Sequence, residues 1–398
     1  MRFVITGATG LLGRNLLFEI LKQNLNCLDD LEVFVLGRRY GRSSVGKYVE
    51  NILVPDGYDY IGLKDKSPID LRSRISSCII PMSFDLNDEN LGMLSDDYGL
   101  LKSKKIDYFF HLAALSDFRD TPIIKARIFD TNVEGTKRLL QLVKTLSLRE
   151  FIYAGSAYSA GFTLGEVFPD YINDTNEFRN PYEESKLKAE LYIKAFANEI
   201  GLRYRIFRLT GIGGRLIEQP IGSICKYDIF YGWALFFLKQ KLKYNKKLKD
   251  MFTFPLSLPM RIAINFKSGM NVVPVDYAAK LILATCINND DNISYHLVND
   301  IDIPNSVHTK LMLKALNIKE YVLVNEEPKD KNLIEKLYYK TVGRIFTPYV
   351  ITDPIYYNHD NLDAIRKKAG LICPPMDEEN FAKLVGYAVE NNFGLTGQ

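Results

Sequence analysis

The chain has 398 residues, a net charge of +3 and 47% apolar side chains. This apolar share can build a sizeable core and excludes wholesale disorder, and the mild charge gives no argument for nucleic-acid binding. Five cysteines lie far apart without a Cys-x-x-Cys pair, and the four histidines are scattered, so neither a disulfide framework nor a metal site is expected.

The first residues already have the pattern of a strand, which leaves no room for a signal peptide. No apolar run reaches 18 residues, so no membrane span is expected. A cytoplasmic, reduced compartment is therefore the default prediction.

Apolar runs typical of buried strands alternate with helical patterns along the first half of the chain. Strands are predicted at residues 2–6, 32–36, 79–84, 106–112, 151–154 and 204–209, and helices at 11–22, 132–146 and 183–200. This alternation predicts a Rossmann-type α/β fold, a doubly wound parallel sheet with helices on both faces.

The pattern changes after about Gly214. We expect residues 1–214, completed by about 270–300, to form the Rossmann core. Residues 215–270 are rich in aromatic side chains, and residues 300–398 mix helix and loop with several prolines. These two segments are predicted to form a smaller substrate-binding lobe over the carboxyl edge of the sheet.

Three glycines lie between the first predicted strand and the first predicted helix. Gly7 permits a tight turn, Gly10 lets the backbone approach a pyrophosphate, and Gly13 allows the helix to pack closely on the sheet. The free N–H groups of the helix N-terminus favour an anion there. The pattern indicates a dinucleotide site.

Arg38 and Arg39 follow the second predicted strand, where an NAD site would place a carboxylate for the ribose 2′-OH. Two arginines suit a 2′-phosphate, so NADPH is favoured over NADH, unless both side chains are merely solvated. Asp85 follows the third strand and is interpreted either as an adenine contact or as the cap of the next turn.

Tyr182 and Lys186 are four residues apart at the start of a predicted helix and therefore share one face. The ammonium group can stabilise the phenolate of Tyr182 and hydrogen-bond a nicotinamide ribose. Ser156 follows the fifth strand, where its hydroxyl either polarises a substrate carbonyl or serves a turn. Asn132 is interpreted as a support for Lys186 or as a helix N-cap.

These motifs together resemble those of the extended short-chain dehydrogenases/reductases over roughly residues 1–215 and 270–300. The resemblance rests on the glycine turn, His111-Leu-Ala-Ala, Asn132-Val-Glu-Gly-Thr, Ser156 and the Tyr182/Lys186 pair. It implies the catalytic set Ser156, Tyr182, Lys186 and Asn132. It also implies cofactor contacts from Gly7, Thr9, Gly10, Leu11, Leu12, Gly13, Arg38, Arg39, Asp85, Ala113, Ala114, Lys186, Leu209 and Thr210.

Three segments are similar to the fatty acyl-CoA reductase and thioester reductase branch, the male-sterility type. They are residues 151–161 (FIYAGSAYSAG), 180–186 (NPYEESK) and 271–277 (NVVPVDY). This likeness implies NADPH-dependent reduction of an acyl thioester, carried by CoA or an acyl-carrier protein, to an aldehyde with Tyr182 as general acid. A second reduction to the alcohol and a homodimer both stay open. A sugar-nucleotide epimerase or dehydratase, a hydroxysteroid-type dehydrogenase, or a non-catalytic NADPH-binding regulator are the alternatives.

Two segments of the lobe have open interpretations. Residues 229–238 (IFYGWALFFL) form either core or interface, or else a wall for an acyl chain or a shallow membrane contact. Residues 239–249 (KQKLKYNKKLK) are either a solvated helix face or a landing surface for an acidic carrier or a phosphorylated ligand tail.

Overall fold

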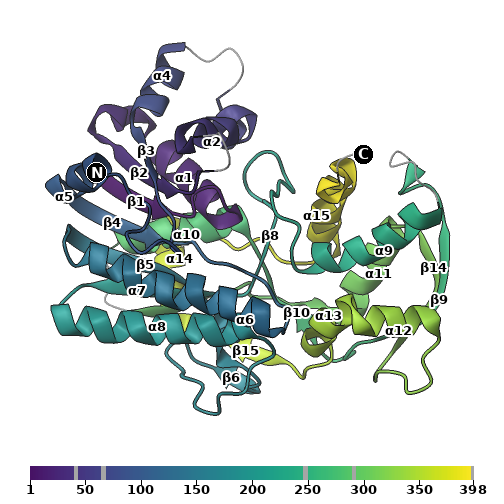
Figure 1. The fold of residues 1–398 in the computed structure, drawn as a ribbon. Coiled ribbons are helices and arrows are strands. Elements are labelled where there is room, and N and C mark those ends of the chain that lie inside the picture. Colours follow the sequence, from purple (N-terminus) through teal and green to yellow (C-terminus); the bar gives the residue numbers. More distant parts are fainter. Residues whose placement is uncertain (40–43, 64–68, 245–249, 289–292, 396–398) are drawn as a thin grey trace.

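A seven-stranded sheet forms the centre of the computed structural model, which describes residues 1–39, 44–63, 69–244, 250–288 and 293–395 (Figure 1). Its strand order is β12-β7-β5-β4-β1-β2-β3, and every neighbouring pair is parallel. The strands are β1 (Arg2–Thr6), β2 (Glu32–Gly37), β3 (Ile79–Ser83), β4 (Lys105–His111), β5 (Ser147–Ser156), β7 (Tyr204–Leu209) and β12 (Ser294–Leu297). The predicted Rossmann-type fold is confirmed.

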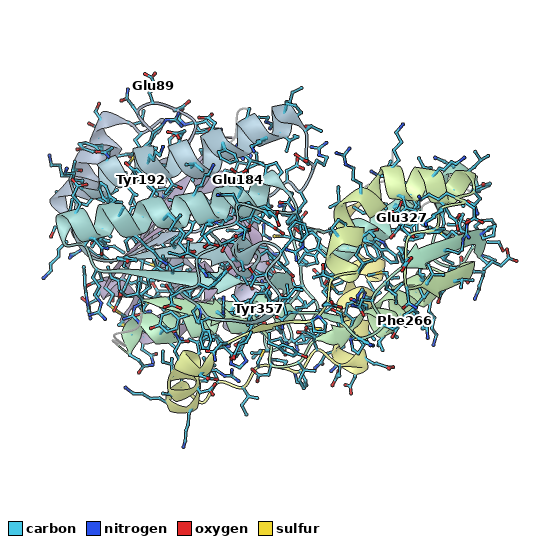
Figure 2. All side chains as sticks on the ribbon, turned by 90° about the horizontal axis from the view of Figure 1, so that it is seen from below. Glu89, Glu184, Tyr192, Phe266, Glu327 and Tyr357 are labelled. Carbon is cyan, nitrogen blue, oxygen red and sulfur yellow. The ribbon has the colours of Figure 1, made fainter. Side chains whose placement is uncertain are left out.

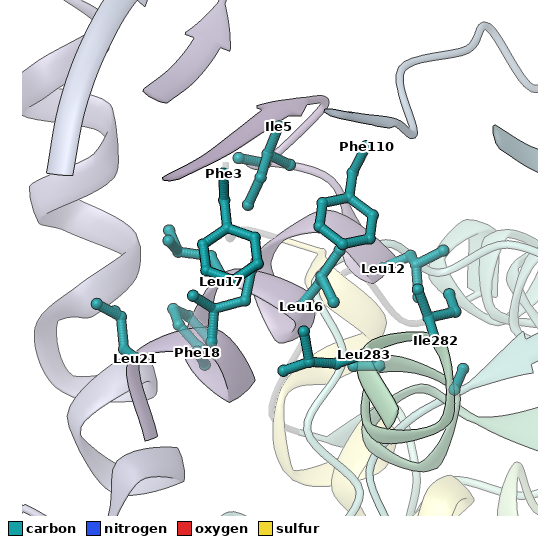
Figure 3. Close-up of a cluster of buried hydrophobic side chains, with 14 of the residues drawn as sticks. Phe3, Ile5, Leu12, Leu16, Leu17, Phe18, Leu21, Phe110, Ile282 and Leu283 are labelled. Atoms are coloured by element: carbon teal, nitrogen blue, oxygen red, sulfur yellow. The ribbon is translucent and has the colours of Figure 1, made fainter. Parts of the chain in front are cut away.

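Helices cover both faces of this sheet because side chains of each strand alternate between them. In β1, Phe3 and Ile5 join one buried cluster and Val4 joins another. Figure 3 shows Phe3 and Ile5 over the leucines of α1 (Leu11–Gln23), with Leu283 of α10 (Val275–Ile287) beside them. The opposite face is covered by α7 (Gly135–Val143) and α8 (Pro181–Ile200).

The predicted helix at 132–146 is wrong at its start. Helical structure begins ten residues earlier with α6 (Pro122–Phe129) and continues through a π-helical turn, η3 (Asp130–Glu134), into α7. Thr121 sets this start, because its hydroxyl accepts a hydrogen bond from the Ile124 N–H and Pro122 follows it at the first helical position. The strand predicted at 151–154 is also longer, since β5 runs from Ser147 to Ser156.

A smaller lobe lies beside the core with a hydrophobic cluster of its own. Its main elements are α9 (Phe230–Tyr244), β9 (Leu256–Ala263), α11 (Asn305–Ala315), β14 (Ile318–Val324), α12 (Leu333–Lys340), α13 (Val342–Val350) and α15 (Glu378–Glu390). Strands β9 and β14 pair in parallel. Figure 2 shows Phe266 and Glu327 on this lobe, and Glu184 and Tyr192 on α8 of the core.

The chain passes between core and lobe several times. Strand β8 (Gly211–Gly213) pairs with β11 (Val272–Pro274), β10 (Gly269–Met270) with β13 (Ile303–Pro304), and β15 (Ile355–Tyr357) with β6 (Gly165–Val167). After β15, α14 (Asp363–Ala369) packs on α10, and Leu362 and Ile365 join the core cluster. We propose that residues 1–214 and about 270–300 form the core, and that residues 215–270 and 300–398 form the lobe, except for residues 355–373, which we assign to the core.

The remaining elements are short. They are η1 (Leu25–Asp30), α2 (Val45–Ile52), η2 (Leu53–Gly57), α3 (Tyr58–Ile61), α4 (Ile69–Ser77), α5 (Ser95–Ser103), η4 (Ala157–Ala160), η6 (Asp360–Leu362) and η7 (Asn392–Gly394). None of the helices in the described ranges is long and apolar enough to cross a bilayer.

The basic stretch at 239–249 is described only up to Tyr244, and residues 245–249 lie outside the described residues. Within α9, Lys239 and Lys243 are exposed, but Lys241 is buried and donates to the Leu316 carbonyl at 2.6 Å. The interpretation as a uniformly solvated helix face is therefore wrong at Lys241.

Candidate active site

The turn between β1 and α1 has the geometry of a cradle for a phosphate. Gly7 has φ +73°, and a Cβ at Gly13 would lie 2.1 Å from the Gly7 carbonyl oxygen. Helix α1 begins directly after Gly10, with no side chain capping its first N–H groups. A dinucleotide pyrophosphate fits this position, because free N–H groups and the helix dipole favour an anion and Gly10 itself carries no side chain.

The loop after β4 closes against this turn. A Cβ at Gly7 would meet the Ala113 backbone nitrogen at 2.8 Å, so Ala113 and the neighbouring Ala114 lie beside the glycine turn. His111 helps to hold the loop there, with its ring nitrogens 2.9 Å from the Thr6 hydroxyl and 3.0 Å from the Thr136 hydroxyl. Burial lowers the pKa of His111 to about 3, so this ring is a neutral structural link.

Arg38 and Arg39 follow β2 directly and are exposed. A third arginine that the sequence interpretation missed lies closer to the glycines. Arg14 donates from Nη2 to the Thr9 carbonyl at 3.1 Å, and its buried Nε has no hydrogen-bond partner. The sequence could have indicated Arg14 as a cofactor contact, because it directly follows Gly13 of the glycine turn.

Asp85 serves the next turn, because its carboxylate accepts a hydrogen bond from the Asn87 N–H at 3.0 Å. This contact matches the capping interpretation, while an adenine contact stays a prediction. Leu209 ends β7 directly opposite Ser156 in the register of the sheet. The hydroxyl of Thr210 donates to the Asn271 side chain at 2.6 Å.

Ser156 is the last residue of β5 and only 3% exposed. Its hydroxyl oxygen accepts a hydrogen bond from the Tyr158 N–H at 3.2 Å. The hydroxyl of Ser156 therefore does stabilise the turn that follows β5, as one of its two interpretations stated. This contact leaves the hydroxyl proton free to point at a substrate oxygen, so the two roles are compatible.

Helix α8 presents Tyr182 and Lys186 from its first two turns. The helix starts at Pro181 because the Asn180 side chain caps it, accepting from the Glu183 N–H. The Lys186 side chain donates from Nζ to the Ala154 carbonyl of β5 at 2.5 Å, two residues before Ser156. The helix and the strand thus bring the predicted catalytic residues to one edge of the sheet.

Burial shifts both ionisable groups of this pair. It raises the pKa of the Tyr182 phenol, which stays protonated and able to donate at neutral pH. Burial lowers the pKa of Lys186 to about 7, although the nearby Glu190 carboxylate acts in the opposite direction. In the free protein the lysine therefore titrates near neutrality.

The buried lysine gives a prediction about stability. A folded-state pKa near 7 means that the unfolded chain, with an ordinary lysine pKa, binds more protons between about pH 7 and 10. Stability due to Lys186 should therefore rise with pH across this window, by at most about 1.4 kcal/mol per pH unit. Denaturant unfolding of the cofactor-free protein at several pH values measures this slope.

Lys186→Met is the control for that experiment. The neutral variant should be more stable than the parent at pH 7, and its advantage should shrink towards pH 10. Parallel stability curves for the two proteins would contradict the lowered pKa.

Asn132 lies inside η3, so the interpretation as a helix N-cap is wrong. Its amide accepts from the Leu115 N–H at 2.8 Å and donates to the Leu115 carbonyl and to the Ser185 hydroxyl, both at 3.0 Å. Asn132 thus ties the loop after β4 to α8, one residue before Lys186. Any support for Lys186 in this geometry is indirect.

A chain of aromatic rings leads from Tyr182 towards the lobe. Phe118 packs against Tyr182 with 5.1 Å between ring centroids, Tyr349 of α13 follows at 6.2 Å from Phe118, and Tyr158 lies 5.3 Å from Tyr349. Phe118, Tyr158 and Tyr349 all line a cavity of about 130 Å³. Phe118 therefore links the Tyr182 ring to the wall of this cavity.

Most of the cavity wall comes from the lobe and is apolar. The apolar wall includes Ile229, Phe230, Trp233, Ile262, Ile264, Met312, Ile345, Phe346 and Val350. Three of these belong to the 229–238 run, while Phe237 of the same run packs in the lobe cluster. The run is thus both core and cavity wall, as its two interpretations allowed.

Comparison with known proteins identifies relatives of the chain. A family model described as male sterility protein matches residues 5–282. A subunit of linear gramicidin synthase from Brevibacillus parabrevis is 22% identical over 413 residues, which cover 99% of this chain and 7% of that protein. A putative UDP-glucose 4-epimerase from Methanocaldococcus jannaschii is 26% identical over 194 residues, 48% of this chain and 59% of that protein. The chain thus spans only part of the curated relatives it matches.

Solved structures share the fold over nearly the whole chain. The terminal R domain from the myxalamid PKS-NRPS biosynthetic pathway has a TM-score of 0.71 at 18% identity, covering 99% of this chain and 91% of that one. A thiolation-reductase di-domain from an archaeal non-ribosomal peptide synthetase has a TM-score of 0.66 at 19% identity, covering 98% and 76%. A UDP-glucose 4-epimerase from Bifidobacterium longum, solved with NAD+ and UDP, has a TM-score of 0.60 at 16% identity, covering 99% and 100%.

Proposed function

Because the chain belongs to the male sterility protein family, we propose that it is an NADPH-dependent reductase that converts an acyl thioester to an aldehyde. The family lies within the extended short-chain dehydrogenases/reductases, which are NAD(P)-dependent oxidoreductases. The names of two relatives support thioester chemistry, since one is a thiolation-reductase di-domain and the other a terminal R domain. CoA or an acyl-carrier protein would carry the acyl group.

One observation carries the proposal: Phe118 packs on the Tyr182 ring and also lines the cavity. Tyr158, whose N–H donates to the Ser156 hydroxyl, lines the cavity as well. An acyl group in the cavity would extend from a carbonyl close to the Ser156 hydroxyl and the Tyr182 phenol. The glycine turn after β1, which is separated from β5 by β4 alone, would hold the cofactor at the same edge of the sheet.

The chemistry follows from these positions. When bound, the cofactor would supply a hydride for the thioester carbon. Ser156 donates a hydrogen bond to the carbonyl oxygen, and Tyr182 stabilises and protonates that oxygen as charge develops on it. The resulting thiohemiacetal expels the thiol and leaves the aldehyde. Lys186, in its ammonium form, favours the phenolate that Tyr182 becomes after losing its proton.

The proposal is tested by following NADPH absorbance with a panel of acyl thioesters and trapping the aldehyde with a hydrazine. We expect thioester-dependent NADPH oxidation with one aldehyde, or the corresponding alcohol, formed for each thiol released. NADPH consumption without thiol release would contradict thioester reduction.

A sugar-nucleotide epimerase is the second candidate, favoured by the match to the Methanocaldococcus jannaschii protein. Such an enzyme would retain NAD+ through purification and turn over without net oxidation of cofactor. Mass spectrometry of the nucleotide released on denaturation, together with UDP-glucose turnover assays, distinguishes the two candidates.

The NADPH preference is tested at the two exposed arginines after β2. Replacing Arg38 and Arg39 together by alanine should weaken NADPH binding at least tenfold and leave NADH within about threefold, because only NADPH carries a 2′-phosphate. Fluorescence titration with both nucleotides measures the two affinities. Equal losses for the two nucleotides would refute the assignment of these arginines to the 2′-phosphate.

A further inference from the structure

The cavity beside Tyr182 also has charged groups in its wall. Arg179 precedes α8, and Asp302 precedes β13, where the chain leaves the core for the lobe. Buried charges in a mostly apolar wall bear on which acyl groups can enter, since a buried charge needs a partner. The third charged residue of the wall, Asp353, is exposed. Arg179 and Asp302 differ in how far their charge is already balanced.

Arg179 is balanced within the protein. Its side chain is 2% exposed and lies 3.6 Å from the Glu183 carboxylate, whose side chain is fully buried. The guanidinium also donates to the Gly161 carbonyl at 2.6 Å. Tyr349 donates to the other Glu183 oxygen at 2.6 Å and the Arg179 backbone N–H donates to the first at 3.1 Å, so the arginine and the glutamate form an ion pair without net charge.

Asp302 has no such counter-ion. One carboxylate oxygen accepts from the Asn271 side chain at 2.6 Å, and no ion pair joins Asp302 to any residue in the described part of the chain. Asn271 is held in turn by Thr210 and by the backbone of Asn299, so the carboxylate has a fixed place. Burial raises the pKa of Asp302, as expected for a carboxylate without a cation nearby.

The carboxylate also lies close to the reacting residues. Asp302 accepts from the Asn271 side chain, which accepts in turn from the Thr210 hydroxyl. Thr210 directly follows Leu209, the residue paired with Ser156 in the register of the sheet. A cation bound by Asp302 would therefore lie near the carbonyl end of an acyl group.

We propose that the preferred substrate is an acyl thioester bearing a protonated amine, an aminoacyl group, which Asp302 binds inside the cavity. The inference deepens the reductase function proposed above and rests on it. The cavity volume restricts the group further, because an engineered apolar cavity of about 150 Å³ accommodates benzene. A cavity of about 130 Å³ fits a compact acyl group of roughly four to six carbon atoms.

A matched pair of substrates isolates the amine. L-valyl and isovaleryl N-acetylcysteamine thioesters differ only in the amino group, and both are small enough for the cavity. We expect the wild-type protein to reduce the valyl thioester with a kcat/KM about 30-fold higher. Asp302→Asn keeps the shape and the contact with Asn271, and should remove this preference by lowering only the valyl value.

Asp353→Asn is the matched control variant. Asp353 also lines the cavity, but it is exposed and bonded to Asn265, so its replacement should leave the ratio of the two substrates unchanged. Equal kcat/KM values for the two thioesters, or equal losses in Asp302→Asn, would overturn the inference while the reductase function stands.

Calorimetry with L-valinamide and isovaleramide separates the inference from the reductase function. If neither thioester is reduced, tighter binding of valinamide that depends on Asp302 would support the amine site and count against the reductase. Equal binding of the two amides would overturn the amine site as well.

Discussion

Replacing Tyr182 by phenylalanine is expected to lower NADPH-dependent turnover by about 10²-fold or more. The ring would keep its edge contact with Phe118, 5.1 Å between centroids, so the shape of the site should persist. Only the phenolic proton is lost, and no other phenol shares a face of α8 with Lys186. The effect should fall on kcat, because the proton moves only as the oxygen acquires charge.

The measurement is a steady-state comparison of wild type and Tyr182→Phe, with NADPH affinity determined separately. Tyr192→Phe is a suitable control, since Tyr192 lies on the same helix and packs on Phe196, away from the site (Figure 2). Near-normal turnover in Tyr182→Phe would remove this residue from the mechanism. A matching fall in Tyr192→Phe would point to the helix as a whole.

Replacing Gly13 by alanine is expected to abolish tight cofactor binding and to destabilise the fold by ~2 kcal/mol. The added Cβ would lie 2.1 Å from the Gly7 carbonyl oxygen and 2.8 Å from Ala8 Cα. Both neighbours are backbone atoms of the turn itself, so the turn must open by about 1 Å. A displacement of that size at a binding loop costs about 10²-fold.

Gly99→Ala provides the comparison for this variant. Gly99 lies in α5 with nothing within 4 Å of the position that the added methyl group would take, and alanine favours a helix by about 1 kcal/mol. It should be neutral or stabilising and bind NADPH normally. Wild-type affinity in Gly13→Ala would show that the turn does not hold the nucleotide closely.

The parts of the site that sequence could predict are local ones. The glycine turn lies within seven residues, and the Tyr182 and Lys186 pair lies within one helical turn, so spacing alone indicates their shared face. Six strands of the central sheet have the apolar pattern of a strand buried on both faces, which explains why their predicted positions overlap the observed ones, although β5 is longer than predicted. The seventh strand, β12, has no counterpart among the strands predicted from apolar runs.

The cavity could not be predicted in this way. Tyr349 and Glu183 are 166 residues apart in sequence, and nothing in either neighbourhood indicates that they meet. The interpretation of Asn132 as a helix N-cap was wrong for a related reason. The helix begins at Pro122, ten residues before Asn132, and is capped by Thr121. An asparagine followed by apolar residues at helical spacing gives the same sequence pattern whether it caps a helix or lies inside one.

The repeated crossings between core and lobe have a consequence for dissecting the protein. Strand β12 completes the central sheet beside β7, and α10 supplies the largest cover over α1, although both follow the first lobe segment in sequence. A fragment cut at residue 214 would expose Phe207 and much of α1 to water. We expect this truncated protein to aggregate. The segments before and after residue 214 therefore cannot be exchanged between proteins or studied as independent domains.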